Sequence, residues 1–141
     1  MSKLFKRMSQ HKVQMQINLK FMEIRTKNPI KEEFYITWKR GQLVEMTKNY
    51  TFVQSNRSTI LTRLDLVDKE FEKVSAFYTN KEGIFQKKMC EFAIMVGKNT
   101  EARMTFDMSK QVGNKNKPIE IHLAGNYIIK VLFKIIPYAN V

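Results

Sequence analysis

Three side chains in this sequence could act as a nucleophile or a soft metal ligand, and they stand far apart along the chain. They are the two histidines, His11 and His122, and the single cysteine, Cys90. A zinc site needs about four such ligands in register, and nucleophilic catalysis needs a base beside the nucleophile. Cys90 lies on the apolar face of a strand pattern, which indicates a core thiol. We therefore expect no catalytic residue, no metal, no cofactor and no enzymatic activity.

Positive charge is the strongest sign of a binding function. The 141 residues carry a formal net charge of +12, which indicates an anionic partner: an acidic phospholipid membrane, an acidic protein surface or nucleic acid. Composition alone is the competing explanation, because Lys, Asn and Ile are all plentiful, and lysines on a strand edge also discourage aggregation. The candidate contacts form two clusters. They are Lys39 and Arg40 with Lys48, and Lys87 with Lys88.

The elements that must position these residues are β-strands. Residues 12–24 and 34–39 alternate between apolar and polar side chains, which is the period of a half-buried strand. The first has one polar face, as in an antiparallel sheet. The second holds the only tryptophan, Trp38, which we expect to anchor the core. It runs through Lys39 and Arg40 into Gly41, which suits a tight turn, so its exit should display positive charge.

The remaining pattern is also that of short strands separated by turn residues. Residues 85–96 are apolar on both sides for part of their length, as in a central strand, and Asp107 is expected to stabilise a turn through its side chain. A brief helical turn at 68–73 and a short apolar piece at 74–78 are less regular. No amphipathic helix and no internal repeat occur. About eight strands predict an all-β, eight-stranded antiparallel sandwich over residues 12–138, after a basic, flexible tail at 1–11. The other expected strands are one or two short strands within 42–54 (43–46 and 50–53), then 59–67, 102–108, 119–123 and 127–136.

Four stretches occur in a characteristic order. They are Trp38-Lys39-Arg40-Gly41 followed by Thr47, Val67-Asp68-Lys69-Glu70-Phe71, Phe85 with Lys87-Lys88 and Glu91-Phe92, and Phe106-Asp107-Met108-Ser109. Together they resemble the amino-terminal C2 (NT-C2) family, the divergent C2-like domain at the front of EH-domain-binding proteins and their relatives. The resemblance covers roughly residues 12 to 136. Two positions depart from it: Val67 stands where the family usually has a tryptophan, and no glycine precedes Ala102.

This resemblance implies an eight-stranded antiparallel C2-like sandwich and a non-enzymatic module that targets or scaffolds. Calcium-dependent C2 domains hold the ion with several loop aspartates, because Ca²⁺ requires six to eight oxygen ligands. Residues 25–33 offer only Glu32 and Glu33 among basic neighbours, and residues 97–101 offer only Glu101. We therefore expect a calcium-independent module that binds an acidic membrane surface or the protein partners of a larger assembly.

Two other classes of function stay open. A small basic nucleic-acid-binding or ribosome-associated protein would use the charge, and Tyr35, Tyr50 and Tyr78 could stack on bases. A structural subunit of a cytoskeletal or ciliary assembly would place the charge against acidic tubulin. The single cysteine, the absence of a signal-peptide pattern in residues 1–11 and the absence of an apolar run of about 20 residues indicate a cytoplasmic protein without a transmembrane segment. We expect it to lie at the periphery of a membrane or of the cytoskeleton.

Overall fold

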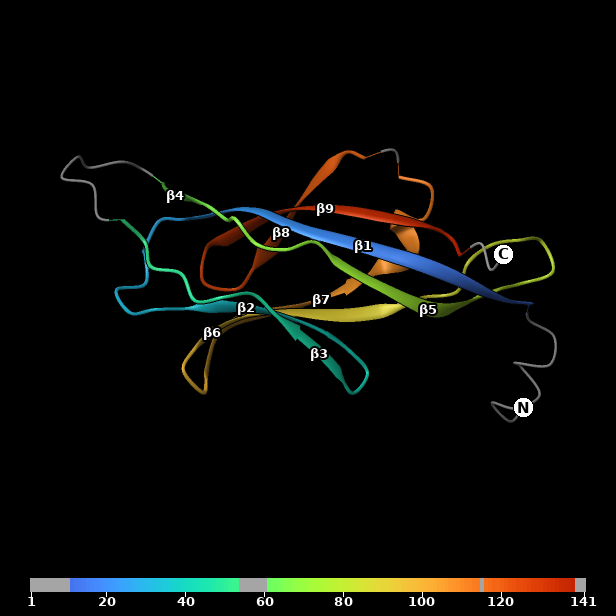
Figure 1. Ribbon diagram of the computed structural model, residues 1–141, viewed down its shortest axis with the longest axis horizontal. Helices are drawn as coiled ribbons and strands as arrows, with labels where there is room; N and C mark the ends of the chain where they lie inside the picture. Colours follow the sequence, from blue (N-terminus) through green and yellow to red (C-terminus); the bar gives the residue numbers. More distant parts are fainter. Residues whose placement is uncertain (1–10, 54–60, 115, 139–141) are drawn as a thin grey trace.

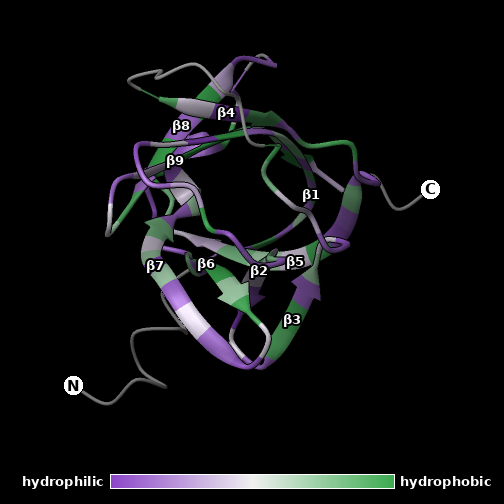
Figure 2. Cartoon of the chain, turned by 90° about the vertical axis from the view of Figure 1, so that its left-hand side faces the viewer, coloured by the Kyte–Doolittle hydropathy of each residue, from purple (hydrophilic) through white to green (hydrophobic). Residues whose placement is uncertain are grey.

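The computed structural model describes residues 11–53, 61–114 and 116–138, which form two antiparallel β-sheets packed face to face (Figure 1). Seen along the long axis, the strands surround a common interior (Figure 2), which apolar side chains fill. No helix among these residues is long and apolar enough to cross a membrane. The elements are β1 (His11–Thr26), β2 (Tyr35–Arg40), β3 (Leu43–Met46), β4 (Thr62–Asp65), β5 (Phe71–Thr79), β6 (Met89–Val96), β7 (Asn99–Asp107), the 3-10 helix η1 (Met108–Gln111), β8 (Pro118–Leu123) and β9 (Tyr127–Pro137).

The first sheet is organised around the long strand β1. Its order is β4-β1-β9-β8, and β5 also pairs with β1. The register of β1 against β9 shifts between Phe21 and Glu23, so the strand contains a bulge. Phe21 and Ile24 are both buried, because the extra residue inverts the alternation. As a consequence, Glu23 and Arg25 point from the outer face of the sheet.

The second sheet has the order β3-β2-β6-β7. β2 and β3 form a hairpin whose turn contains Gly41 at a φ of 57°, a left-handed conformation that glycine adopts without a steric penalty. Lys39 lies opposite Glu91 on β6. At the edge of the sandwich, Lys73 of β5 and Glu45 of β3 form an ion pair with an Nζ–Oε1 distance of 2.9 Å. This ion pair links the first sheet to the second.

Aromatic rings hold the two sheets together. Phe133 of β9 lies 6.2 Å from Trp38 of β2, 5.9 Å from Phe92 of β6 and 5.5 Å from Phe106 of β7, measured between ring centroids. Trp38, Phe92 and Phe133 are fully buried. The prediction that Trp38 anchors the core is confirmed.

The predicted all-β sandwich of antiparallel strands is confirmed, and the described residues form nine strands where about eight were expected. The additional strand is β5, which spans the residues for which a helical turn and an apolar piece were predicted. The strand expected at 50–53 is reduced to a single bridge between Phe34 and Tyr50. Of the strand expected at 59–67, only Thr62–Asp65 is paired, and residues 59 and 60 lie outside the described part. Residues 1–10 of the predicted tail lie outside it too, and His11 already belongs to β1.

Candidate anion-binding surfaces

The five predicted basic residues do not form one patch. Lys39 is exposed on the outer face of β2. Lys48 lies toward the other end of the same strand, because the neighbouring Thr47 N–H donates to the Ile36 carbonyl. The backbone N–H of Lys48 donates to Asp68 Oδ2, and its ammonium stands 5.5 Å from the Tyr50 ring. The predicted cluster of Lys39, Arg40 and Lys48 is therefore divided.

Arg40 corrects the prediction that the exit of β2 displays positive charge. Its side chain is buried, with 7% of its surface exposed. β2 continues through Arg40, so strand alternation places Arg40 on the same inward face as Trp38. The guanidinium carbon lies 4.7 Å from the centroid of the Trp38 ring. Burial lowers the pKa of the guanidinium, and the charge of Glu45 opposes this effect.

Lys87 is exposed, whereas Lys88 turns toward the interior. The Lys88 ammonium lies 5.7 Å from the ring of Phe77, which is a buried residue of β5. The pairing of β2 with β6 brings Lys88 to the same end of the second sheet as Arg40. The Lys88 backbone N–H donates to Asp107 Oδ1 at 3.0 Å. Asp107 also accepts from the Ser109 N–H and hydroxyl, so its predicted role in stabilising a turn is confirmed.

A strip of lysines on the outer face of the first sheet was not singled out from the sequence. Lys20 of β1 lies opposite Leu132 of β9, between the neighbouring outward positions Lys130 and Lys134. Lys12 extends the strip along β1. None of the four forms an ion pair within the described residues. Alternation in residues 12–24 and 127–136 could have indicated these outward positions, but only the pairing of β1 with β9 brings them together.

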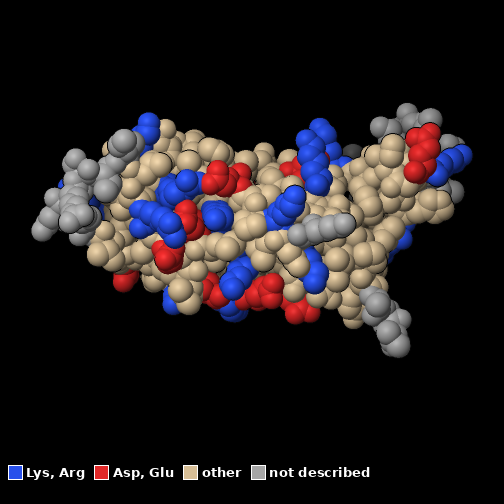
Figure 3. Space-filling view, turned by 90° about the horizontal axis from the view of Figure 1, so that it is seen from above, with Lys and Arg blue, Asp and Glu red and all other residues tan. Residues whose placement is uncertain are grey.

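Beside this lysine strip (Lys12, Lys20, Lys130 and Lys134) lies a compact network of ion pairs. Glu23 forms ion pairs with Arg25 and Arg63, at 3.0 Å from Arg25 Nε and 2.8 Å from Arg63 Nε. Arg63 also pairs with Asp65 at 3.2 Å, and Arg25 Nη2 pairs with Glu120. Figure 3 shows this face: acidic and basic atoms interleave toward its left and along its lower edge, and near its centre basic atoms stand among uncharged ones. Three carboxylates of the face are therefore paired with two arginines, so the network keeps one negative charge and compensates only part of the charge of the lysine strip.

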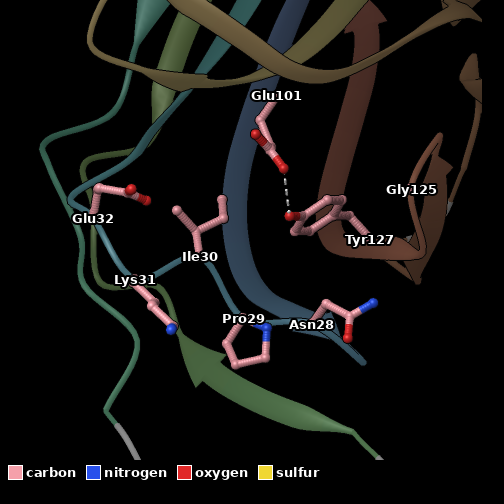
Figure 4. Close-up of a pocket in the computed structure, with 8 residues that line it drawn as sticks. All are labelled: Asn28, Pro29, Ile30, Lys31, Glu32, Glu101, Gly125 and Tyr127. Carbon is pink, nitrogen blue, oxygen red and sulfur yellow. Dashed lines mark hydrogen bonds between the residues drawn. The ribbon is translucent and has the colours of Figure 1, made fainter.

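A pocket of about 350 Å³ opens at the end of the sandwich where the β1–β2 and β8–β9 connections meet the start of β7 (Figure 4). Tyr127 crosses it and donates a hydrogen bond to Glu101 Oε1 at 3.1 Å. Burial, with the hydrogen bond and charge of Glu101, raises the pKa of Tyr127 to about 12. Glu32 and Lys31 line the opposite side. Within the described residues, no group of three His, Cys, Asp or Glu side chains is placed to hold a metal ion.

Cys90 is expected to be unreactive in the folded protein. It is buried, and burial raises the pKa of its thiol to about 12, against the opposing charge of Arg40. Because only the thiolate is nucleophilic, labelling by Ellman's reagent at pH 8 should be on the order of 1,000-fold slower than for an unperturbed thiol. The same chain in concentrated guanidinium is the control and should react within seconds. Rapid labelling without denaturant would contradict the buried placement.

The fold of the chain is shared with proteins of very different sequence. No family model matches it, and no curated protein sequence matches it. Human GIVD cytosolic phospholipase A2 is structurally similar, with a TM-score of 0.62 and 12% identity over 91% of this chain and 16% of that chain. The same enzyme in complex with methyl gamma-linolenyl fluorophosphonate inhibitor and terbium chloride has a TM-score of 0.63 and 12% identity. That match covers 93% of this chain and 18% of that chain. A structure described as "Structure of a C2 domain" has a TM-score of 0.48 and 11% identity, over 86% of this chain and 97% of that chain.

At 12% identity the likeness to the phospholipase chains is one of fold, and this chain spans less than a fifth of their length. It extends over nearly the whole domain, including both sheets. The chain has an all-β sandwich fold of two antiparallel sheets, which it shares with a part of the phospholipase chains.

Proposed function

We propose that the protein is a non-enzymatic, calcium-independent C2-like module of the NT-C2 type that acts in the cytoplasm by docking on an acidic phospholipid membrane. The observation that carries the proposal is the lysine strip on the outer face of the first sheet. Four lysines project there, whereas Glu72 is the carboxylate of that face left outside the ion pairs. Val74 and Ile136 are exposed on the same face and add apolar contact area.

The binding free energy expected from the lysine strip agrees with reversible docking on a membrane. Each Lys or Arg close to an anionic membrane contributes about 1 kcal/mol. Four lysines are offset by Glu72 and by the one carboxylate charge that Arg25 and Arg63 leave unneutralised in the network. The face therefore supplies about 2 kcal/mol, which is weak and strongly dependent on salt. Calcium independence is supported by the loop pocket, where the Glu101 carboxylate already accepts the Tyr127 hydroxyl and Lys31 brings positive charge.

Vesicle flotation tests the docking face directly. The wild-type chain should float with vesicles containing about 30% phosphatidylserine at low salt, lose most binding at about 0.5 M salt, and be indifferent to a calcium chelator. Replacing Lys20, Lys130 and Lys134 with glutamine should reduce the bound fraction to background, because about 3 kcal/mol is removed.

A matched variant tests whether vesicle binding depends on the lysine strip or only on the net charge of the protein. Lys39, Lys81 and Lys98 are exposed outside the first sheet, and their replacement by glutamine removes the same number of charges. That variant should keep most of the binding. Equal losses in the two variants would show that charge acts without a defined face. No flotation by the wild type at low salt would remove the membrane proposal and leave an acidic protein surface as the partner of the strip.

A further inference from the structure

One edge of the second sheet, strand β3, carries backbone groups without partners. Within the described residues β3 pairs with β2 alone, and it lies at the lower rim of the molecule in Figure 1. Along an antiparallel strand, successive residues direct their N–H and C=O groups alternately toward and away from the neighbouring strand. The Thr47 N–H donates to the Ile36 carbonyl of β2 at 2.9 Å. The Lys48 N–H points away from β2 and donates to Asp68 Oδ2 at 2.9 Å.

The same alternation continues back through β3. Val44 and Met46 share the orientation of Lys48, so their N–H and C=O groups point outward from the edge of the sheet. Leu43 and Glu45 direct theirs toward β2. No backbone hydrogen bond joins Val44 or Met46 to another described segment. Two N–H donors and two C=O acceptors are therefore open to a further strand.

Apolar side chains are exposed beside these groups. Val44 and Met46 project from the outer face of the second sheet and are 45% and 56% exposed. Leu43, at the start of the strand, is exposed as well. Lys39 shares the outer face, but it lies opposite Glu91 of β6. An exposed apolar edge strand is a template for pairing with another strand.

Other sheet edges of the molecule are protected against such pairing. Charged side chains or a proline on an edge strand discourage it, and β4, β7 and β8 expose residues of this kind. They are Arg63, Asp65, Glu101, Arg103, Pro118 and Glu120. On β3 the charged residue is Glu45, which is only partly exposed and is bound by Lys73 of β5. Strand addition is therefore favoured at β3 over these edges.

A second copy of this chain is disfavoured at β3. Each copy carries a formal net charge of +12, so two copies repel each other. If Val44 paired with Met46 of the other copy, the two Glu45 side chains would stand directly opposite each other, and like charges in that position destabilise a strand pair. A partner with acidic side chains is attracted by the same net charge.

Lys48 marks the end of the open edge. Its N–H is taken by Asp68, so the open stretch ends at Met46. The Lys48 ammonium is exposed, stands 5.5 Å from the Tyr50 ring and forms no ion pair within the described residues. In a strand antiparallel to β3, the residue two positions before the one that faces Met46 lies beside this ammonium. A carboxylate at that position would be paired.

We propose that β3 binds an extended segment of an acidic partner protein by strand addition. The segment runs antiparallel to β3 and pairs its backbone with Val44 and Met46. It places two alternate apolar side chains beside theirs, preceded by an acidic side chain next to Lys48. This inference goes beyond the membrane docking proposed above, because β3 belongs to the second sheet and the lysine strip to the first.

Val44→Pro tests the open backbone groups. Proline has no N–H and is tolerated where an edge strand faces solvent, so the variant should fold, with unchanged Trp38 fluorescence, while it lacks one donor of the open edge. Val44→Ala keeps the N–H and is the matched control.

The probe is a library of random short peptides, displayed and selected on the wild-type chain. Enriched peptides should carry an acidic residue followed by two alternate apolar residues. Val44→Pro should weaken binding of the enriched peptide by at least about tenfold, because a hydrogen bond is lost and the ring obstructs the added strand. Val44→Ala should weaken it by less than about threefold, because the backbone groups remain.

A methylated peptide series makes the test independent of how any variant folds. N-methylation of the enriched peptide at the two residues that pair with β3 should abolish binding, whereas methylation of the residue between them should change it less than about threefold, because that N–H points away. In the wild type, the Val44 and Met46 amides should exchange with solvent rapidly when free and at least about tenfold more slowly with the peptide bound.

Four results would overturn the proposal. They are enrichment of no peptide, equal binding to the wild type and Val44→Pro, enriched peptides without acidic residues, and indifference to methylation at the pairing residues. Sedimentation that shows dimers of the wild type but not of Val44→Pro would assign β3 to a second copy and also exclude the acidic partner. Flotation with phosphatidylserine vesicles should be the same for Val44→Pro and the wild type, so failure of the membrane proposal is distinguished from failure of this one.

Discussion

Replacing Phe133 with alanine should lower the free energy of unfolding by about 3–5 kcal/mol. Phe133 is fully buried and contacts Trp38, Phe92 and Phe106, so it joins β9 of the first sheet to three strands of the second. Its removal leaves a cavity that the surrounding rings cannot fill, and the edge-to-face contacts with Trp38 and Phe92 are lost. Urea denaturation followed by Trp38 fluorescence measures the effect.

Ile136 supplies the matched control on the same strand. It lies on the opposite face of β9 and is 37% exposed. Ile136→Ala should change the free energy of unfolding by less than about 0.5 kcal/mol, as is usual for surface positions. Comparable losses in the two variants would mean that β9 does not present Phe133 to the core.

Asp107→Ala should cost about 2–3 kcal/mol, which is unusually large for one partly exposed carboxylate. Asp107 Oδ1 accepts three hydrogen bonds, from the Lys88 N–H, the Ser109 N–H and the Ser109 hydroxyl. It is also the N-cap of η1. Loss of the cap costs about 1 kcal/mol, and the partly buried Lys88 N–H left without its acceptor adds about 1–2 kcal/mol. Asp107→Asn keeps one acceptor oxygen, so it should lower the free energy of unfolding by less than half as much as Asp107→Ala.

The pH dependence separates the charge of Asp107 from its hydrogen bonds. Burial alone would raise the pKa of the carboxyl, but the hydrogen bonds from Lys88 and Ser109 and the charge of Lys110 outweigh it and hold the pKa below its ordinary value. Because the folded pKa is depressed, this contribution is present above the ordinary pKa of about 3.9 and is lost as the pH falls through the lower, folded value. The stability difference between wild type and Asp107→Asn should therefore shrink below about pH 4. A difference that does not change down to pH 2 would show that the charge contributes nothing.

Most of the fold was predicted from the regular alternation of apolar and polar residues along the strands. In β1 the apolar positions up to Phe21 face the core as expected, and β6 is central as its two apolar sides indicated. The bulge after Phe21 was not predicted, because an extra residue leaves no mark in the pattern other than a shift of parity near the end of the strand. β5 was missed as a strand because Lys73, an inward position at the edge, is charged and is explained only by Glu45 on the other sheet.

The candidate site was less predictable, since it depends on pairings between distant segments. Arg40 was expected at the surface because its charge was given more weight than its parity with Trp38. Lys20, Lys130 and Lys134 sit at outward positions that the sequence indicates, but their proximity follows from the register of β1 against β9. The ion pairs of Glu23, which decide how much of that face stays basic, likewise join residues from three different strands.

The pairing of β1 with β9 also has a consequence for synthesis of the chain. These strands come from opposite ends of the described sequence and form the most extensive pairing in the molecule. Such a topology has a high contact order and folds slowly. The chain loses the entropy of closing a long loop before the contacts between the two strands can stabilise it. During translation β1 is synthesised before β9. Until β9 pairs with it, β1 keeps its apolar face and one strand edge uncovered. The nascent domain is therefore open to aggregation until its last strand leaves the ribosome, and a chaperone would act during that interval.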